Sequence, residues 1–270
     1  MKFQIFQIDT FTSSLFGGNP AAVVPMAEWL PDQTLQCIAR ENNLAETAFF
    51  VPLAEPDQFH IRWFTPTTEV PLCGHATLAS AYAIFNCLKT NPAYPAGRRS
   101  DKISFQSLSG WLHVQREGDW LTLDFPTDTL HAAALPDAAR DALHILPKEV
   151  YRGRENFLLV YESEAEVLAL APDFRVLKTA HDAGFICTAP GSESDFVSRC
   201  FFPAYGIDED PVTGSAHTSS TPYWVEKLGK NPLTAIQVSE RRGHLRCTLA
   251  GERVLMSGQA VLFLEGNIEV

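Results

Sequence analysis

Glu46 is the residue whose sequence context best suits acid/base chemistry. It lies in the segment NNLAETAFF, residues 42–50, where it begins a strand that is otherwise apolar. A carboxylate at such a boundary is partly removed from water, which raises its pKa toward the range of a group that accepts and returns a proton. We therefore predict that Glu46 is a general acid/base catalyst. An exposed glutamate at the edge of a strand is the alternative.

Two glycine turns contain further groups that could contact a substrate. Residues 69–76 read EVPLCGHA and residues 209–216 read EDPVTGSA, so Glu, Pro, Gly and Ala recur at the same places. A helix is predicted to begin at each glycine, Gly74 and Gly214. The backbone N–H groups of a first helical turn lack partners within the helix, and together with the helix dipole they favour an anion such as a carboxylate or enolate. An ordinary capped helix start is the alternative for each turn.

His75 and Asp210 are the side chains of these turns that could orient a substrate and transfer protons. In the register of the repeat, His75 matches Ser215 and Asp210 matches Val70. We predict catalytic roles for His75 and Asp210 beside Glu46. Helix capping alone is the alternative for His75 and Ser215.

Other chemistries fit the residues less well. Cys73 would lie at a helix N-terminus, where a thiol is acidified and could act as a base. Its partner in the repeat is Thr213, so a matched pair of thiols is absent. Ser215, His217 and Asp210 are the residue types of a hydrolase triad, but the G-x-S-x-G turn is missing and their spacing is too close.

The composition excludes several classes of partner. The 270 residues carry a net charge of −11, which disfavours binding to nucleic acid or to anionic membranes. The six cysteines and eight histidines show no metal-ligand spacing, and no phosphate or dinucleotide loop is present, so we predict no metal and no cofactor. Scattered cysteines also favour a reducing, cytoplasmic location. The longest apolar stretch, residues 76–85, is too short to span a bilayer.

The glycine turns belong to a longer internal repeat. Arg62-Trp-Phe-Thr-Pro66 is echoed by Arg199-Cys-Phe-Phe-Pro203 at nearly the same offset. The repeat predicts two similar domains, residues 1–125 and 126–270, with a last strand that could return to the first. Each is expected to be a mainly antiparallel, barrel-like sheet around one buried helix, an α+β fold. The expected strands cover residues 3–8, 21–24, 46–51, 60–64, 103–108, 111–116, 120–125, 156–161, 185–187, 195–202, 236–239, 244–249, 253–257 and 259–264.

The expected helices comprise two central ones and two on the surface. The central helices run from Gly74 to about Lys89 and from Gly214 to Leu228, and the first is apolar on every face. Pro222 lies inside the second and should kink it or shift its start. Shorter helices are predicted from Pro31 and over residues 163–170. The proline-rich stretch 126–148 is expected to carry the chain into the second half.

Four motifs in order resemble the phenazine-biosynthesis PhzF-like family. They occupy residues 9–24, 42–50, 61–79 and 210–217, and the resemblance continues through residues 258–268. This family is in turn similar to diaminopimelate epimerase and proline racemase, which share its duplicated fold. The resemblance implies a homodimer of two-domain subunits with a cofactor-free site in the cleft between the domains.

The resemblance also implies roles for individual residues. The family's catalytic glutamate falls on Glu46, its histidine on His75, its aspartate on Asp210 and its serine on Ser215. Glycines 74 and 214 would contribute the backbone anion pocket. Further residues of the same motifs are expected to bind substrate: Asn19, Ala45 and Ala76. The second helix, HTSSTP at 217–222, is more polar than is usual in the family.

These observations predict a cofactor-independent isomerase. It would move a proton between carbon positions of a small substrate that bears an amine or a carboxylate, by general acid/base catalysis. A racemase or epimerase with Cys73 as a base is one alternative. A non-catalytic relative that binds a small molecule is another.

Overall fold

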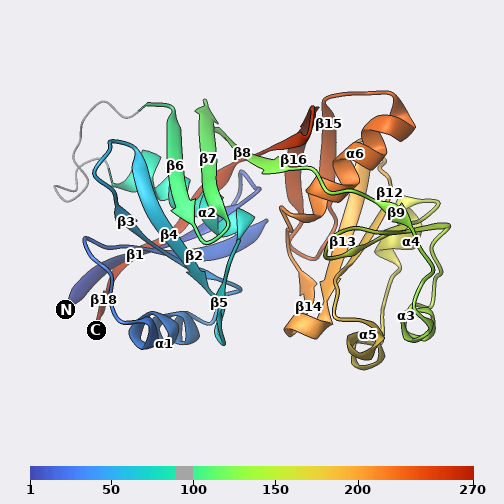
Figure 1. Ribbon diagram of the computed structural model, residues 1–270, viewed down its shortest axis with the longest axis horizontal. Helices are drawn as coiled ribbons and strands as arrows, with labels where there is room; N and C mark the ends of the chain where they lie inside the picture. The colour runs from blue at the N-terminus through green and yellow to red at the C-terminus, as the bar shows by residue number, and fades with distance from the viewer. Residues whose placement is uncertain (89–99) are drawn as a thin grey trace. The chain divides into compact units, whose positions relative to one another are not determined.

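The computed structural model describes residues 1–88 and 100–270, and the chain divides into two compact units (Figure 1). The first unit consists of Met1–Asp124 and Ser257–Val270, and the second of Phe125–Met256. Both termini therefore belong to the first unit, where the N–H of Val270 donates to the carbonyl of Met1 over 2.8 Å. Among the described residues, no helix has the length and apolar content needed to cross a membrane.

The first unit is built on one sheet. Its strands are β1 (Lys2–Thr10), β2 (Asn19–Pro25), β3 (Thr47–Pro52), β4 (Gln58–Phe64), β5 (Glu69–Val70), β6 (Lys102–Ser107), β7 (Gly110–Glu117), β8 (Trp120–Pro126) and β18 (Ala260–Glu269). They pair in the order β18–β1–β2–β3–β4–β6–β7–β8, and β5 also pairs with β4. The pairs β2–β3 and β4–β6 are parallel and the other pairs of this order are antiparallel, so the sheet is mainly antiparallel.

Strand β4 shows how the sequence directs one face of this sheet inward. Phe59, Ile61 and Trp63 are buried, whereas the alternate residues His60 and Arg62 are half-buried on the other face. This period of two is the pattern of a strand with one covered face. Strand β3, by contrast, is buried from Thr47 to Val51, which explains why its sequence is apolar without alternation.

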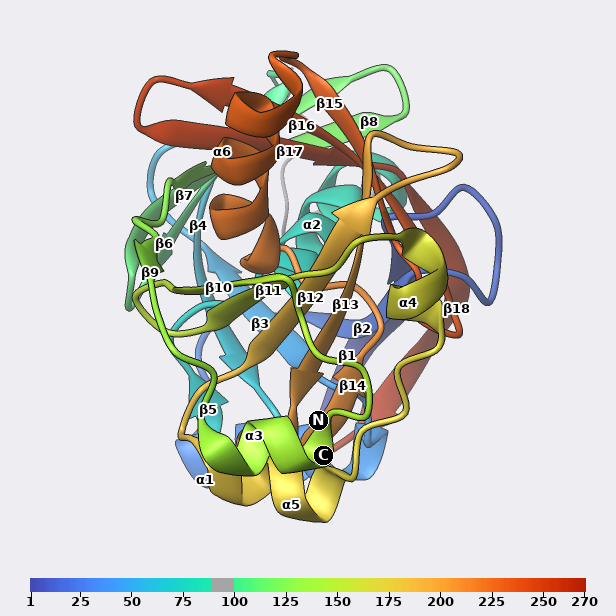
Figure 2. The same cartoon turned by 90° about the vertical axis from the view of Figure 1, so that its right-hand side faces the viewer.

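The central helix of the first unit is α2 (Gly74–Tyr82), and every residue from His75 to Ala81 is buried. The prediction of a helix buried on all faces is confirmed. The α-helix ends at Tyr82 and continues as a π-helical turn, Ala83–Cys87, and Lys89, its predicted end, lies outside the described residues. In Figures 1 and 2, α2 lies among the strands of its unit, and it packs on β1, β2 and β3.

The second unit repeats this plan. Its strands are β9 (His131–Ala132), β10 (Glu149–Arg152), β11 (Phe157–Val160), β12 (Phe185–Pro190), β13 (Phe196–Phe202), β14 (Ile207–Asp210), β15 (Leu233–Gln237), β16 (Gly243–Ala250) and β17 (Arg253–Gly258). The pairing β9–β10–β11–β12–β13–β15–β16 is again antiparallel except at β11–β12 and β13–β15. These two parallel pairs correspond to β2–β3 and β4–β6, which confirms the predicted duplicated α+β fold.

Matched side chains reinforce the repeat. Arg62 and Glu69 form a double hydrogen bond across β4–β5, with both distances 2.7 Å. Arg199 and Glu209 form the same bond across β13–β14, at 2.8 Å. Each guanidinium also lies 5.1 Å from the ring of the phenylalanine two residues later in its strand. The repeated sequence motifs therefore contain the same ion pair in both units, and this ion pair joins the short strand β5 or β14 to its sheet.

The central helix of the second unit is α6 (Ala216–Leu228), which packs beside β16 (Figure 2). It begins two residues after the predicted start, because Gly214 and Ser215 form a turn. The helix continues past Pro222. Proline has no N–H to donate to the carbonyl of Thr218, but the backbone N–H of Asp128 donates to that carbonyl over 3.2 Å. This bond from outside the helix replaces the missing one.

Shorter helices cover the sheets. In the first unit α1 (Asp32–Asn42) buries Leu35, Ile38 and Ala39, close to its predicted place. In the second unit α4 (Glu164–Leu168) follows the predicted segment, with Ser163 as its N-cap. The sequence did not predict α3 (Asp137–Ala142), α5 (Phe174–Ala180), η2 (Pro203–Tyr205) or the strands β5, β9, β10 and β14. The stretch 126–148 thus contains β9 and α3.

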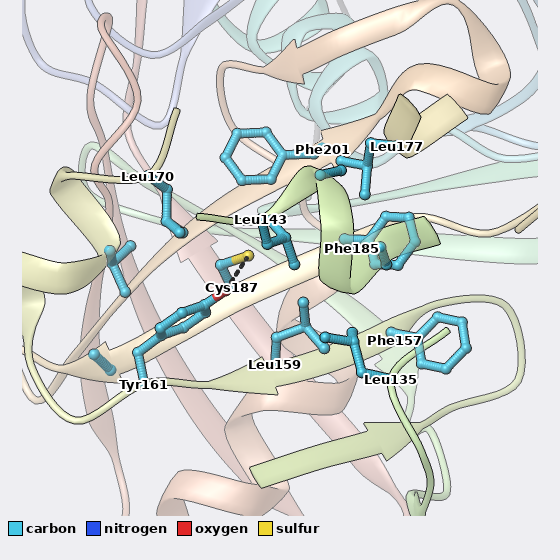
Figure 3. Packing of buried hydrophobic residues seen from close by; sticks show 14 of the residues in the cluster. Leu135, Leu143, Phe157, Leu159, Tyr161, Leu170, Leu177, Phe185, Cys187 and Phe201 are labelled. Atoms are coloured by element: carbon cyan, nitrogen blue, oxygen red, sulfur yellow. Dashed lines mark hydrogen bonds between the residues drawn. The ribbon is translucent and has the colours of Figure 1, made fainter. Parts of the chain in front are cut away.

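A large apolar core stabilises the second unit (Figure 3). Phe157 and Phe185 stack with ring centroids 5.6 Å apart, and Leu159 is fully buried beside them. Cys187 is buried in this core, with Sγ 4.0 Å from the hydroxyl of Tyr161. Burial raises the pKa of the Cys187 thiol to about 12, so it packs as an apolar group rather than as a nucleophile.

Candidate active site

Glu46 immediately precedes β3, and its backbone is fixed by the parallel pairing of β2 with β3. The N–H of Ala22 donates to the carbonyl of Glu46 over 3.3 Å. The side chain of Glu46 is only 13% exposed. The carboxylate is thus largely withdrawn from water, as the context of its sequence predicts, while the predicted increase in its pKa stays a prediction.

His75 lies next to Glu46. Its Nε2 is 3.2 Å from Oε2 of Glu46, and its side chain is 6% exposed. The Nε2–H direction is not aligned with the carboxylate as a hydrogen bond, a looseness that is common at catalytic contacts before substrate binds. Burial lowers the pKa of His75 to about 3. The imidazole is therefore neutral at physiological pH.

Cys73 completes this group from the other side of the imidazole. Its Sγ lies 3.5 Å from Nδ1 of His75. A neutral imidazole carries one N–H. With the proton on Nε2, facing the carboxylate of Glu46, Nδ1 becomes the acceptor and the thiol of Cys73 the donor. The imidazole then lies between the thiol, which donates to Nδ1, and the carboxylate, 3.2 Å from Nε2.

The start of α2 adds backbone groups to this cluster. Cys73 is the N-cap in an extended conformation and supplies no side-chain cap. Its carbonyl accepts bonds from both the N–H and the hydroxyl of Thr77, at 3.2 and 2.5 Å. The turn is thus held from within the helix, while the first N–H groups at Gly74 and Ala76 receive no side-chain cap and can face an anion.

Asn19 and Ala45 lie on the elements beside Glu46. Asn19 begins β2 and is fully buried, and its carbonyl accepts from the hydroxyl of Thr10 over 2.9 Å. Gly18 before it has a φ of +61°, and a Cβ there would lie 1.9 Å from the carbonyl oxygen of Thr10. Only glycine fits this turn. Ala45 is half-buried directly before Glu46.

The second unit holds its own polar group around Asp210, the last residue of β14. The hydroxyl of Thr213 donates to Oδ2 of Asp210 over 2.5 Å. Gln237, fully buried at the end of β15, donates to the carbonyl of Asp210 over 2.7 Å and accepts from the N–H of Thr213 over 2.7 Å. Both the backbone and the side chain of Asp210 are therefore fixed. The sequence analysis missed Gln237, whose only signal is a polar residue at the end of a buried strand.

Gly214 and Ser215 form the turn that leads into α6. The carbonyl of Gly214 accepts from the N–H of His217 over 3.0 Å, and Ser215 is exposed. Nδ1 of His217 faces the carbonyl of Thr213 at 2.9 Å, and burial lowers the pKa of His217 to about 4. This imidazole therefore points to a backbone carbonyl and not to Asp210, which excludes the hydrolase triad.

The predicted site residues thus fall into two groups, one in each unit. Glu46, His75, Gly74 and Ala76 gather at the start of α2, together with Cys73. Asp210, Gly214 and Ser215 gather before α6. Among the described residues, the side chains of Glu46, Cys73 and His75 also place ligand atoms within 4.8 Å of one another. Carboxylate, thiolate and imidazole are the ligands that bind Zn²⁺.

Comparison with known proteins gives consistent matches. Residues 8–266 match the family model described as phenazine biosynthesis-like protein, PhzC-PhzF. An uncharacterized isomerase of Pseudomonas aeruginosa is 47% identical over 270 residues, covering 100% of both chains. The crystal structure of a PhzF-family protein from Enterococcus faecalis has a TM-score of 0.92 and 40% identity, covering 100% of both chains. A probable proline racemase from Agrobacterium radiobacter has a TM-score of 0.61 at 10% identity, covering 99% of this chain and 92% of its own, and shares the fold.

Proposed function

Because the chain belongs to the phenazine biosynthesis-like PhzC-PhzF family, we propose that it is an isomerase that works without a cofactor. It would move a proton between carbon positions of a small substrate bearing an amine or a carboxylate. The observation that carries the proposal is the buried pair Glu46 and His75, 3.2 Å apart, with His75 neutral. A carboxylate beside a neutral imidazole can accept a proton. A positively charged imidazolium would instead stabilise the ionised carboxylate and make it a weaker base.

In the proposed reaction, Glu46 removes a proton from a carbon next to an electron-withdrawing group. The C–H bond breaks, the proton passes to the carboxylate, and the electron pair moves into the neighbouring π system. Glu46 then returns the same proton to another carbon, so no oxidant or reductant is consumed. The uncapped first turn of α2 would stabilise the anion that forms between the two transfers.

His75 and Cys73 would control which atoms carry protons. The thiol of Cys73, 3.5 Å from Nδ1, favours the tautomer with N–H on Nε2. That N–H faces Glu46. It can donate a hydrogen bond to the carboxylate, or to the substrate when the carboxylate holds the proton. We therefore assign His75 a direct role and Cys73 a positioning role.

The repeat supports a mechanism with one base. The N–H of Ala22 bonds to the carbonyl of Glu46, and in the second unit the N–H of Phe157 bonds to the carbonyl of Gly184. Gly184 is thus the counterpart of Glu46 and has no side chain. The counterpart of Cys73, Thr213, donates its hydroxyl to Asp210. Neither feature supplies a second base for a racemase.

Asp210 is proposed to hold the substrate's amine. Its carboxylate and carbonyl are fixed by Thr213 and Gln237, and a binding group needs such a fixed position. The participation of Asp210 with Glu46 in one reaction stays a prediction, and the turnover of the Asp210→Asn variant tests it. The homodimer also stays a prediction, and light scattering of the purified protein tests it.

Carbon–hydrogen exchange in D₂O, followed by NMR, tests the proposed activity. The substrates are a panel of cyclic amino acids, amino-dienes and a dihydro-hydroxyanthranilate. The test variant is Glu46→Gln, and the matched control is Glu41→Gln, the same change at an exposed position of α1. We expect deuterium at a carbon position, or a new isomer, with the parent and with Glu41→Gln, and neither with Glu46→Gln.

Three results would change the assignment. If Glu46→Gln exchanges as fast as the parent, Glu46 is not the base and the Cys73→Ser variant is measured next. If the product differs from the substrate only in configuration at one carbon, the enzyme is a racemase or epimerase. Absence of exchange with every compound, while the compounds shift the melting temperature, would favour a binding protein.

A further inference from the structure

A cavity lies in the first unit, at the end of α2 opposite His75. It has a volume of about 260 Å³ and is lined by residues that include Tyr82, Asn86, Arg116, Asp119, Leu121 and Val261. Since a helix rises about 1.5 Å per residue, Tyr82 lies roughly 10 Å along the axis from His75. None of the residues that form the cluster at Glu46 lines this cavity.

Opposite charges border the cavity at the turn between β7 and β8. Arg116 lies two residues before Gly118 and Asp119 directly after it, and the φ of +59° at Gly118 allows the tight turn. Nε and Nη2 of Arg116 donate to Asp101 over 3.1 and 2.7 Å, and the guanidinium lies 4.5 Å from the ring centroid of Phe85. These contacts hold the cation in place and leave its Nη1 outside both bonds. A group held in advance loses less entropy when it binds a ligand.

The helix contributes neutral polar groups to the lining. The hydroxyl of Tyr82 accepts from the backbone of Leu262, and burial together with nearby Cys87 and Asp119 raises the pKa of Tyr82. Its hydroxyl therefore stays protonated and can donate to a ligand. Asn86 is exposed within the π-helical turn Ala83–Cys87. Such turns occur frequently at functional sites.

The rest of the lining combines apolar side chains with the polar residues Ser13 and Gln259. Leu121 is buried on β8, and Val261 is half-buried on β18. A ligand that fits this lining carries a negative group, a positive group and a short hydrocarbon portion. With a volume of about 260 Å³, the cavity has room for several waters or one small metabolite. An amino acid has this size and this distribution of charge.

We propose that this cavity is a second ligand site, which binds a small amino acid as its zwitterion. The carboxylate would contact Arg116 and Tyr82, the ammonium group would contact Asp119, and the side chain would lie against Leu121 and Val261. Because His75 and Tyr82 belong to the same helix, a ligand here would contact the element that positions the imidazole. The binding claim itself does not depend on the proposed isomerase activity.

Calorimetric titration of the full chain with each of the proteinogenic amino acids tests the proposal. We expect at least one to bind with a stoichiometry of one per chain. Affinity should fall about tenfold or more in Asp119→Asn and in Arg116→Gln, since each removes one charge-assisted contact. The matched control is Glu117→Gln, an exposed residue of the same hairpin that does not line the cavity, and it should bind like the parent.

Two further measurements identify the site and the chemistry. Glu46→Gln should bind the amino acid unchanged, which separates this cavity from the cluster at Glu46. The N-acetylated and the amidated forms of the best ligand should bind at least about tenfold more weakly, because each lacks one charge. Asp119 is exposed, so its variant is expected to keep the melting temperature of the parent. Absence of saturable binding, or binding that both charge variants retain, would overturn the proposal.

Discussion

The buried imidazole of His75 should make the protein sensitive to mild acid. In the unfolded chain a histidine has a pKa of about 6.5, whereas burial lowers the pKa of His75 in the folded protein to about 3. Between these values the unfolded state binds a proton that the folded state does not. The free energy of unfolding therefore decreases as the pH falls below about 6.5 and stops decreasing near pH 3.

The magnitude follows from the two pKa values. At pH 5 the unfolded state gains about 2 kcal/mol from protonating this one histidine, by linkage. His217 is buried in the second unit with a pKa of about 4, and it adds about 2 kcal/mol at the same pH. Both contributions are close to zero at pH 7.5. A sizeable part of the acid sensitivity thus comes from the two imidazoles at the starts of the central helices.

Urea unfolding at pH 5 and at pH 7.5 measures this effect in the parent, His75→Asn and His217→Asn. We expect the difference between the two pH values to shrink by about 2 kcal/mol in each variant. His244→Asn replaces an exposed histidine and should leave the difference unchanged. If His75→Asn keeps the full difference of the parent, the imidazole is not a buried neutral group and the tautomer argument for Cys73 fails with it.

Three further perturbations test the scaffold and the site. Arg199→Ala should lower the free energy of unfolding of the second unit by about 3 kcal/mol, because it leaves the carboxylate of Glu209 without its partner. Urea unfolding measures this loss, and a change within error would mean that the ion pair is only a surface contact. Gln237→Leu removes the hydrogen bonds to Asp210 and Thr213. It should lower the free energy of unfolding by about 2 kcal/mol and also reduce turnover. Reduced stability with an unchanged kcat would show that catalysis does not depend on the position of Asp210. Added Zn²⁺ should inhibit carbon–hydrogen exchange by binding Cys73, His75 and Glu46. The Cys73→Ser variant should be less sensitive to Zn²⁺ than the parent. Equal inhibition of the parent and the variant would mean that the metal binds elsewhere.

Sequence patterns predicted those parts of the fold that depend on local periodicity or on the repeat. The all-round apolar sequence of α2 specified a buried helix, and the alternating sequence of β4 specified a strand with one covered face. The strands β5 and β9 contain two residues each, too few to show a period. The end of the α-helix at Tyr82 also left no pattern, because a π-helical turn has the same apolar composition as the helix before it.

The candidate site was predictable where a residue's role follows from its own neighbours in sequence. Glu46 and His75 were selected this way, and the structure places them 3.2 Å apart. Their catalytic roles stay a prediction. The bonds of Gln237 to Asp210 and Thr213 join β15 to β14, and only the folded chain brings these strands together. The hydrogen bond from Asp128 to Thr218, which allows Pro222 inside α6, also joins residues far apart in the sequence. It could not be predicted for the same reason.

The repeat helps to distinguish residues that maintain the fold from those proposed to carry the chemistry. Some side chains shared by the two halves form the same structural bond in both. The hydroxyl of Ser80 donates to the carbonyl of Ala76, and that of Ser220 donates to Ala216 in the same way. Such pairs hold a helix or a strand in either unit, whatever the substrate.

The two units differ at the position of Glu46. Glu46 has Gly184 as its counterpart, and a Cβ at Gly184 would lie 2.1 Å from the ring of Phe202. The second unit therefore has no room for a base at this position, although its backbone forms the same bond. If Glu46 is the acid/base group, the absence of a carboxylate at Gly184 favours a mechanism in which one group removes and returns the proton on the same side of the substrate. Such a group favours a shift between carbons over inversion at one carbon.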